Sequence, residues 1–229
     1  MRTVLNEALV SNRATRARRV VTLAIAMMLL AVALSFNAQF LLPAYVIVIV
    51  GTIMLHWGGR AVGKWIGEPR FDQSLAKALK NVNHGYQLYS YVLPADHVIV
   101  GPSGLFVLKV KPHDGDISCR GNKWHRAFRW QHLWRLLSQE SLGNPTKQAN
   151  EEADKARRFL SDRLPDVNVP VRPLVVFIDP NANLEVVDPS VPVLHLRDVK
   201  AHLREAKHGE AIPAKTLQAL LSAFDDLLD

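Results

Sequence analysis

The sequence predicts an α/β domain preceded by a pair of transmembrane helices. The first observation is an apolar segment, because the chain contains no Asp, Glu, Lys or Arg from Val20 to Gly59. The second is the order of the patterns that follow: short runs rich in Val, Ile, Leu and Phe, then a helical pattern, then another apolar run. Strands and helices in this order are typical of an α/β domain.

Length and composition set further limits. The 229 residues allow one domain of ordinary size together with additional segments. The single cysteine, Cys119, excludes an internal disulfide and a cysteine-based zinc site. The net charge is +7, and residues 1–19 contribute +4 of it, with five Arg and one Glu. The basic excess therefore lies mainly in a short N-terminal arm.

The apolar segment is too long for one span, because a helix crosses the bilayer core with about 20 residues. The polar residues 37–39 interrupt it, so we expect spans at residues 20–36 and 40–57. Arginines precede the first span, and Arg60 and Lys64 follow the second. Positive charge marks the cytoplasmic side. We therefore expect a multi-pass protein of the cell membrane with both the N-terminus and the C-terminal domain in the cytoplasm.

The predicted organisation is a basic arm at residues 1–19, two transmembrane helices within 20–57, a linker at 58–67 and a cytoplasmic domain at 68–229. A secretory signal peptide is an alternative for the first apolar run, with a weak cleavage site at Ala38. The second apolar run follows at once and favours the transmembrane pair.

The domain is expected to begin with a short amphipathic helix and to continue with strands, one long helix and further strands. The expected elements are a helix at 71–81, a strand at 86–93, the two strands of a hairpin within 96–111, a strand at 115–119, a helix from 145 to about 164, strands at 174–178 and 191–196, and two C-terminal helices that begin at 198 and 213. Asn144 is the expected N-cap of the long helix, with Pro145 at its first position.

The segment from Asp96 to Lys111 reads as two strands joined by a tight turn at Gly101–Gly104. If Gly101 faces Gly104, then Asp96 faces Lys109. Strand alternation places Lys109 and Lys111 on one face. One carboxylate and two ammonium groups then gather at the open end of the hairpin, although a slip of one residue would change this register.

The segment from Asp96 to Lys111 resembles the nuclease-related domain family, NERD, whose members are similar to PD-(D/E)xK nucleases. Further residues match the family pattern over about residues 65–180. These are Gly67-Glu68, Gly115-Asp116-Ile117, Trp124 and Asn144-Pro145-Thr146-Lys147-Gln148. The resemblance implies a restriction-endonuclease-like mixed sheet flanked by helices, here preceded by the transmembrane hairpin.

The resemblance also implies roles for individual residues. Asp96 would be a metal ligand for Mg²⁺ or Mn²⁺, and Lys111 the catalytic lysine. Glu68 would be the helical acid, and Gln148 the glutamine that borders the site. Lys109 departs from the family pattern, which has Glu at this position.

Lys109 changes the expected chemistry of the site. Opposite Asp96, its ammonium group would pair with the carboxylate and repel a divalent cation. One carboxylate beside two ammonium groups favours phosphate over Mg²⁺, so we expect no cofactor unless another acid completes the site. Such an acid would come from one of four neighbours, namely Asp114, Asp116, Glu151 and Glu152.

A second stretch, residues 118–139, mixes basic and aromatic residues without any acid. Such a stretch can contact phosphates and stack on unpaired bases. The candidate nucleic-acid-binding residues are Lys109, Arg120, Lys123, Trp124, Arg126 and Arg129. Two other interpretations remain open: the aromatic residues belong to the core under arginine stems, or the stretch rests on anionic lipid headgroups.

Three functional hypotheses follow. The first is a degenerate nuclease fold that binds nucleic acid or another phosphate-bearing partner without cutting it. The second is an active Mg²⁺-dependent nuclease with a relocated acid. The third is a membrane-associated interaction module. The sequence predicts no oligomeric state.

Overall fold

A computed structural model describes residues 1–67, 70–80, 82, 85–127, 141–165, 167–206 and 211–227. The described residues belong to two compact units. One contains residues 1–6 together with the domain that begins at Phe71, and the other contains the helices between Glu7 and Arg70.

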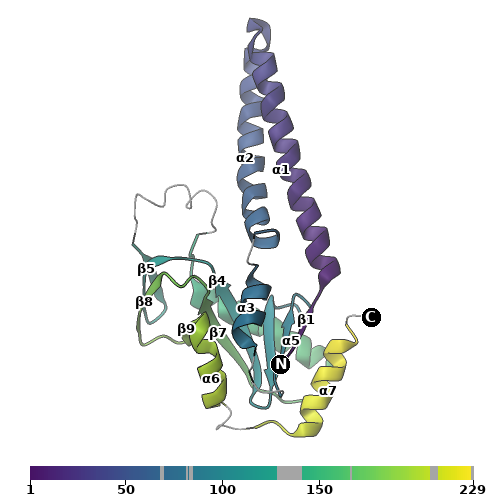
Figure 1. Ribbon diagram of the computed structural model, residues 1–229, viewed down its shortest axis with the longest axis vertical. Helices are drawn as coiled ribbons and strands as arrows, with labels where there is room; N and C mark the ends of the chain where they lie inside the picture. The colour runs from purple at the N-terminus through teal and green to yellow at the C-terminus, as the bar shows by residue number, and fades with distance from the viewer. Residues whose placement is uncertain are drawn as a thin grey trace. The chain divides into compact units, whose positions relative to one another are not determined.

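Within the described residues, the domain is built on a six-stranded sheet with the order β1-β2-β3-β4-β7-β9 (Figure 1). Its strands are β1 (Arg2–Leu5), β2 (Gln87–Ser90), β3 (His97–Gly101), β4 (Gly104–Lys111), β7 (Val171–Phe177) and β9 (Val193–His195). The pairs β2–β3 and β3–β4 are antiparallel, and the other pairs are parallel. A smaller sheet has the order β6-β5-β8, formed by β5 (Gly115–Arg120), β6 (Lys123–Arg126) and β8 (Ala182–Val187). The prediction of a mixed sheet is confirmed.

Helices cover both faces of the larger sheet. They are α3 (Phe71–Leu79), α5 (Pro145–Arg163), α6 (Val199–Ala206) and α7 (Ala214–Asp225), with a short 3₁₀ helix η3 (Leu196–Asp198) before α6. One core cluster joins the sheet to α5 and α7, through residues such as Val107, Ala153 and Phe224. The other joins it to α3 and α6, through residues such as Phe106 and Leu75. Both faces are buried, so the central strands read as continuous apolar runs.

Strand β1 is a feature that the sequence analysis did not predict. Residues 2–5, expected within a separate arm, pair in parallel with β2, and Arg2 lies opposite Gln87. Val4 belongs to the core, and the Arg2 guanidinium pairs with Asp225 of α7 at 2.6 Å. Burial, reinforced by the Asp225 carboxylate, raises the pKa of Tyr89 well above its usual range. The Tyr89 hydroxyl therefore stays protonated and donates to Asp225 at 3.2 Å.

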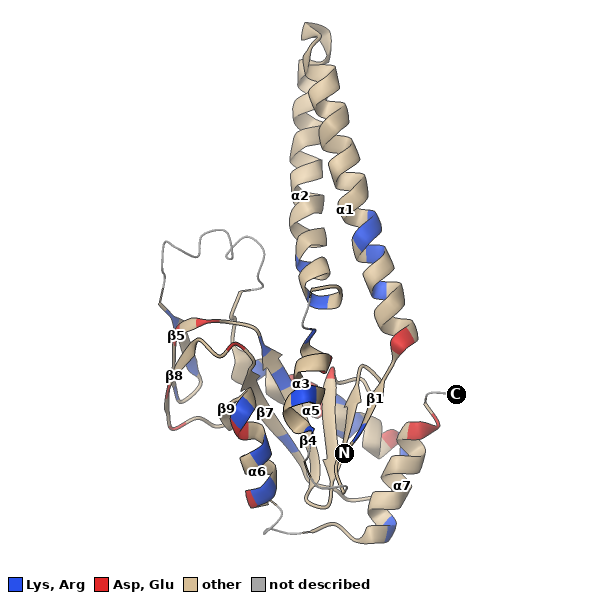
Figure 2. Cartoon of the chain, viewed as in Figure 1, with Lys and Arg blue, Asp and Glu red and all other residues tan. Residues whose placement is uncertain are grey.

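The second unit is a helical hairpin. It consists of α1 (Glu7–Ser35), a 3₁₀ turn η1 (Ala38–Phe40) and α2 (Leu41–Trp65). Both helices are long and apolar enough to cross a membrane, by length and composition. They are longer than the expected spans, because the basic residues on either side of the apolar segment continue the helices. Figure 2 shows these charges at the helix ends away from the turn, whereas the parts near the turn carry none.

Small residues let the two helices pack closely. The buried residues of both helices recur at intervals of seven, and they are Val10, Ala17, Ala24 and Ala31 on α1, and Ala44, Gly51 and Gly58 on α2. A Cβ atom on Gly58 would lie only 2.8 Å from Cγ2 of Val21. Large apolar side chains such as Leu30, Ile49 and Trp57 are exposed on the outside. Small residues between helices and large apolar residues outside are typical of transmembrane helix pairs.

Candidate functional site

The hairpin of β3 and β4 has the predicted register. Gly101 lies opposite Gly104, and Val98 lies opposite Val107. Extending this register by two residues places Asp96 opposite Lys109, at the open end of the hairpin. A slip of one residue is therefore excluded.

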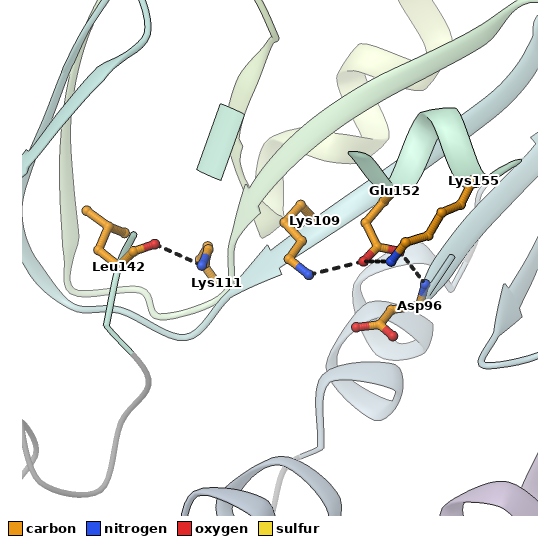
Figure 3. Close-up of polar contacts among 6 residues, drawn as sticks. All are labelled: Asp96, Lys109, Lys111, Leu142, Glu152 and Lys155. Atoms are coloured by element: carbon orange, nitrogen blue, oxygen red, sulfur yellow. Dashed lines mark hydrogen bonds and ion pairs between the residues drawn. The ribbon is translucent and has the colours of Figure 1, made fainter. Parts of the chain in front are cut away.

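Glu152 of helix α5 brings a second carboxylate to this end of the hairpin (Figure 3). Among the described residues, three donors converge on it. The Nζ atoms of Lys109 and Lys155 lie 3.5 and 3.4 Å from its Oε1 atom, and the backbone N–H of Asp96 donates to its Oε2 atom at 3.3 Å. Glu152 is one of the four neighbouring acids that the sequence offered. Lys155, one turn further along the helix, was not singled out.

Lys111 lies on the same face of β4 as Lys109 but makes a different contact. Lys111 is 3% exposed, and its Nζ atom donates to the carbonyl oxygen of Leu142 at 2.9 Å (Figure 3). This contact compensates part of the cost of burying an ammonium group. It also fixes the segment that leads into helix α5.

Helix α5 begins as predicted. Asn144 is its N-cap and accepts a hydrogen bond from the Lys147 backbone N–H at 2.9 Å, and Pro145 occupies the first turn. Gln148 is half-buried and lies one turn before Glu152, so both residues face the sheet. The cap therefore sets the register in which α5 presents Glu152 to Lys109.

Two residues of the basic and aromatic stretch have partners within the domain. The Trp124 indole N–H donates to the Thr146 hydroxyl at 2.9 Å, and its ring packs against Phe177. The Arg126 guanidinium pairs with the buried Asp114 carboxylate at 2.6 Å. These contacts favour the interpretation of Trp124 and Arg126 as structural residues.

The other predicted residues of this stretch differ in their surroundings. Arg120 is exposed and lies 3.5 Å from Glu185 of β8, and Lys123 is also exposed. Arg129 and Glu68 lie outside the described residues, as does the stretch from 128 to 140.

The side chains at this end of the hairpin are poorly suited to bind a divalent cation. Among the residues that the structure describes, no group of three or more His, Cys, Asp or Glu side chains could hold a metal ion. Both Glu152 oxygens already accept from donors, and two of these donors are ammonium groups. A Mg²⁺ ion beside Glu152 would meet strong repulsion from Lys109 and Lys155. Asp114 and Asp116 supply no substitute, since they contact Arg126 and Asn183.

The fold defines a nuclease-like α/β domain joined to two helices that are apolar enough to span a membrane. The profile of the family described as nuclease-related domain, NERD, matches residues 63–178, and the chain belongs to this family. No curated protein and no solved structure matches the chain.

Proposed function

We propose that the protein is a membrane-anchored member of this family that binds nucleic acid or another phosphate-bearing partner without cutting it. The observation that carries the proposal is the pairing of Lys109 with Glu152 at 3.5 Å, at the position where the resemblance implies a glutamate. Asp96, Lys111 and Gln148 surround the same end of the sheet and are proposed to line the binding site.

The charges at this end of the sheet favour an anion. Three ammonium groups and two carboxylates lie at this end of the sheet: Lys109 and Lys155 contact Glu152, Asp96 lies beside them, and Lys111 is turned toward the carbonyl oxygen of Leu142 (Figure 3). The sum is three minus two, a net charge of +1. The exposed Arg120 and Lys123 are proposed to extend the contact along the nucleic-acid backbone, where basic residues bind irrespective of sequence.

Binding should not require a metal ion. We expect a labelled single-stranded oligonucleotide to bind the full-length protein in neutral detergent with EDTA present, and the affinity to fall as salt rises. Removing one ammonium group by Lys109→Gln should weaken binding by about fivefold, in the range of one charge-assisted contact. Fluorescence anisotropy measures both effects.

Lys147→Gln is the matched control, because Lys147 lies on the same helix and is 75% exposed. We expect this variant to bind within about twofold of the wild type, since a surface ion pair contributes little. Strand cleavage by the wild type in the presence of Mn²⁺, or binding only with Mn²⁺, would contradict the proposal.

We further propose that α1 and α2 span the cell membrane with both ends in the cytoplasm. Strand β1 precedes α1, and it pairs with β2, which follows α2. This pairing supports a helical hairpin that enters and leaves on one side. The basic residues at the helix ends support a cytoplasmic location for that side. A cleaved signal peptide is disfavoured, because cleavage after α1 would separate β1 from the rest of the domain.

Cysteine labelling in intact cells tests this arrangement. The only cysteine, Cys119, is buried, so we expect little background labelling of the wild-type protein. A membrane-impermeant maleimide should label Asn37→Cys at the turn between the helices, and should label Ser11→Cys only after the cells are permeabilised. Labelling of Ser11→Cys in intact cells would reverse the proposed orientation.

A further inference from the structure

We propose that the Glu152 carboxylate is an internal competitor, which occupies the place that a phosphate group of the partner takes upon binding. This inference rests on the proposed function. It assigns the phosphate position to the space between Lys109, Lys155 and the backbone N–H of Asp96, and it makes Glu152 the group that must move.

The three donors form an anion site from separate parts of the chain. Lys109 comes from β4, Lys155 from α5 and the Asp96 N–H from the segment before β3. Two ammonium groups and a backbone N–H on one carboxylate are the donors that also bind phosphate oxygens. Glu152 is 8% exposed, so little water reaches its carboxylate. Charge interactions are stronger there than at the surface.

The distances show that Glu152 fills this site loosely. The contacts are 3.3–3.5 Å long, whereas tight charge-assisted hydrogen bonds measure about 2.7–2.9 Å. A carboxylate has two oxygens for three donors, so Lys109 and Lys155 share Oε1. Inorganic phosphate or a terminal phosphate group can offer each donor its own oxygen, whereas a phosphodiester of the backbone offers two non-bridging oxygens, as many as Glu152 does. Lys155 is 52% exposed and can follow an incoming group.

Replacing Glu152 with glutamine tests the competition. Gln keeps the length of the side chain and removes its charge, so the donors become available to an external anion. We expect Glu152→Gln to bind the labelled oligonucleotide about tenfold more tightly than the wild type, which corresponds to about 1.4 kcal/mol. Inorganic phosphate should displace the oligonucleotide at a correspondingly lower concentration. The measurement is fluorescence anisotropy on the full-length protein in neutral detergent with EDTA.

Glu151→Gln is the matched control. Glu151 is adjacent on α5, is exposed and lies 3.9 Å from Lys147. It carries the same charge and should change affinity by less than about twofold. If Glu152→Gln fails to fold, as judged by thermal unfolding, Glu152→Asp replaces it. Its shorter side chain withdraws from the donors and should also tighten binding.

The outcomes separate this inference from the function on which it rests. If Glu152→Gln binds with the same affinity as the wild type, or more weakly, Glu152 is not a competitor of phosphate, while the proposed function stands. If only the variant binds, the role of Glu152 as a competitor is supported. The protein would then bind its partner only when Glu152 has left the three donors. Absence of binding by every protein, including both Glu152 variants, would overturn both.

Discussion

Alanine in place of Gly101 is expected to destabilise the nuclease-related domain by about 3 kcal/mol, the upper end of the usual cost of overpacking. A Cβ atom at this position would overlap with Cδ1 and Cε1 of the Tyr86 ring. The tyrosine ring cannot move away easily. It is 2% exposed, and its hydroxyl donates to the Leu203 carbonyl oxygen at 2.9 Å and lies 3.3 Å from the Ser103 hydroxyl.

Thermal unfolding of the full-length protein measures this effect. A loss of about 3 kcal/mol should lower the Tm of the domain by about 6–12 °C. Tyr86→Ala provides the control in a double-mutant cycle, since it removes the ring that Gly101→Ala would strike. The double variant should lose less stability than the sum of the two single variants. An unchanged Tm for Gly101→Ala would contradict the close approach of Gly101 and Tyr86.

Glutamate at position 109 is expected to create a divalent-metal site among Asp96, Glu152 and the new carboxylate. It would place a carboxylate opposite Asp96 and next to Glu152, so three acidic side chains would face one another. It would also remove the ammonium group that lies 3.5 Å from Glu152. Oxygen-rich groups of this kind bind Mn²⁺ and Mg²⁺.

Calorimetric titration of the full-length protein with Mn²⁺ checks this prediction. We expect Lys109→Glu to bind Mn²⁺ at one site at least about tenfold more tightly than the wild type. Asp96→Asn in the same variant should abolish that binding. Lys147→Glu makes the same charge change on an exposed part of α5 and should add no site. If Lys109→Glu gains no affinity, position 109 is not what prevents metal binding.

The sequence predicted the central fold well, because its signals there are local. The Gly-Pro-Ser-Gly turn determined the register of β3 and β4, and Asn144-Pro145 determined where α5 begins. Strand β1 has no comparable signal. It is four residues long, and Arg2 pairs in parallel with Gln87, which is far away in the sequence. Parallel strands are not joined by a tight turn, so no turn motif marks this pairing in the sequence.

The candidate site was predicted in part. The position of Asp96 opposite Lys109 follows from strand alternation alone. The choice of Glu152 among four nearby acids depends on how α5 packs on the sheet, which the sequence does not specify. Likewise, the contacts of Arg126 with Asp114 and of Trp124 with Thr146 require the folded β5–β6 hairpin. Basic residues that appeared available in the sequence therefore have partners in the structure.

The position of β1 has a consequence for biosynthesis. A ribosome makes residues 2–5 before the two apolar helices, and it makes both helices before the strand β2 with which β1 pairs. Strand β1 therefore has no pairing partner until both helices have been made, so the helical hairpin is complete before the sheet is. A fragment that starts after the helices would expose the edge of β2 to other chains.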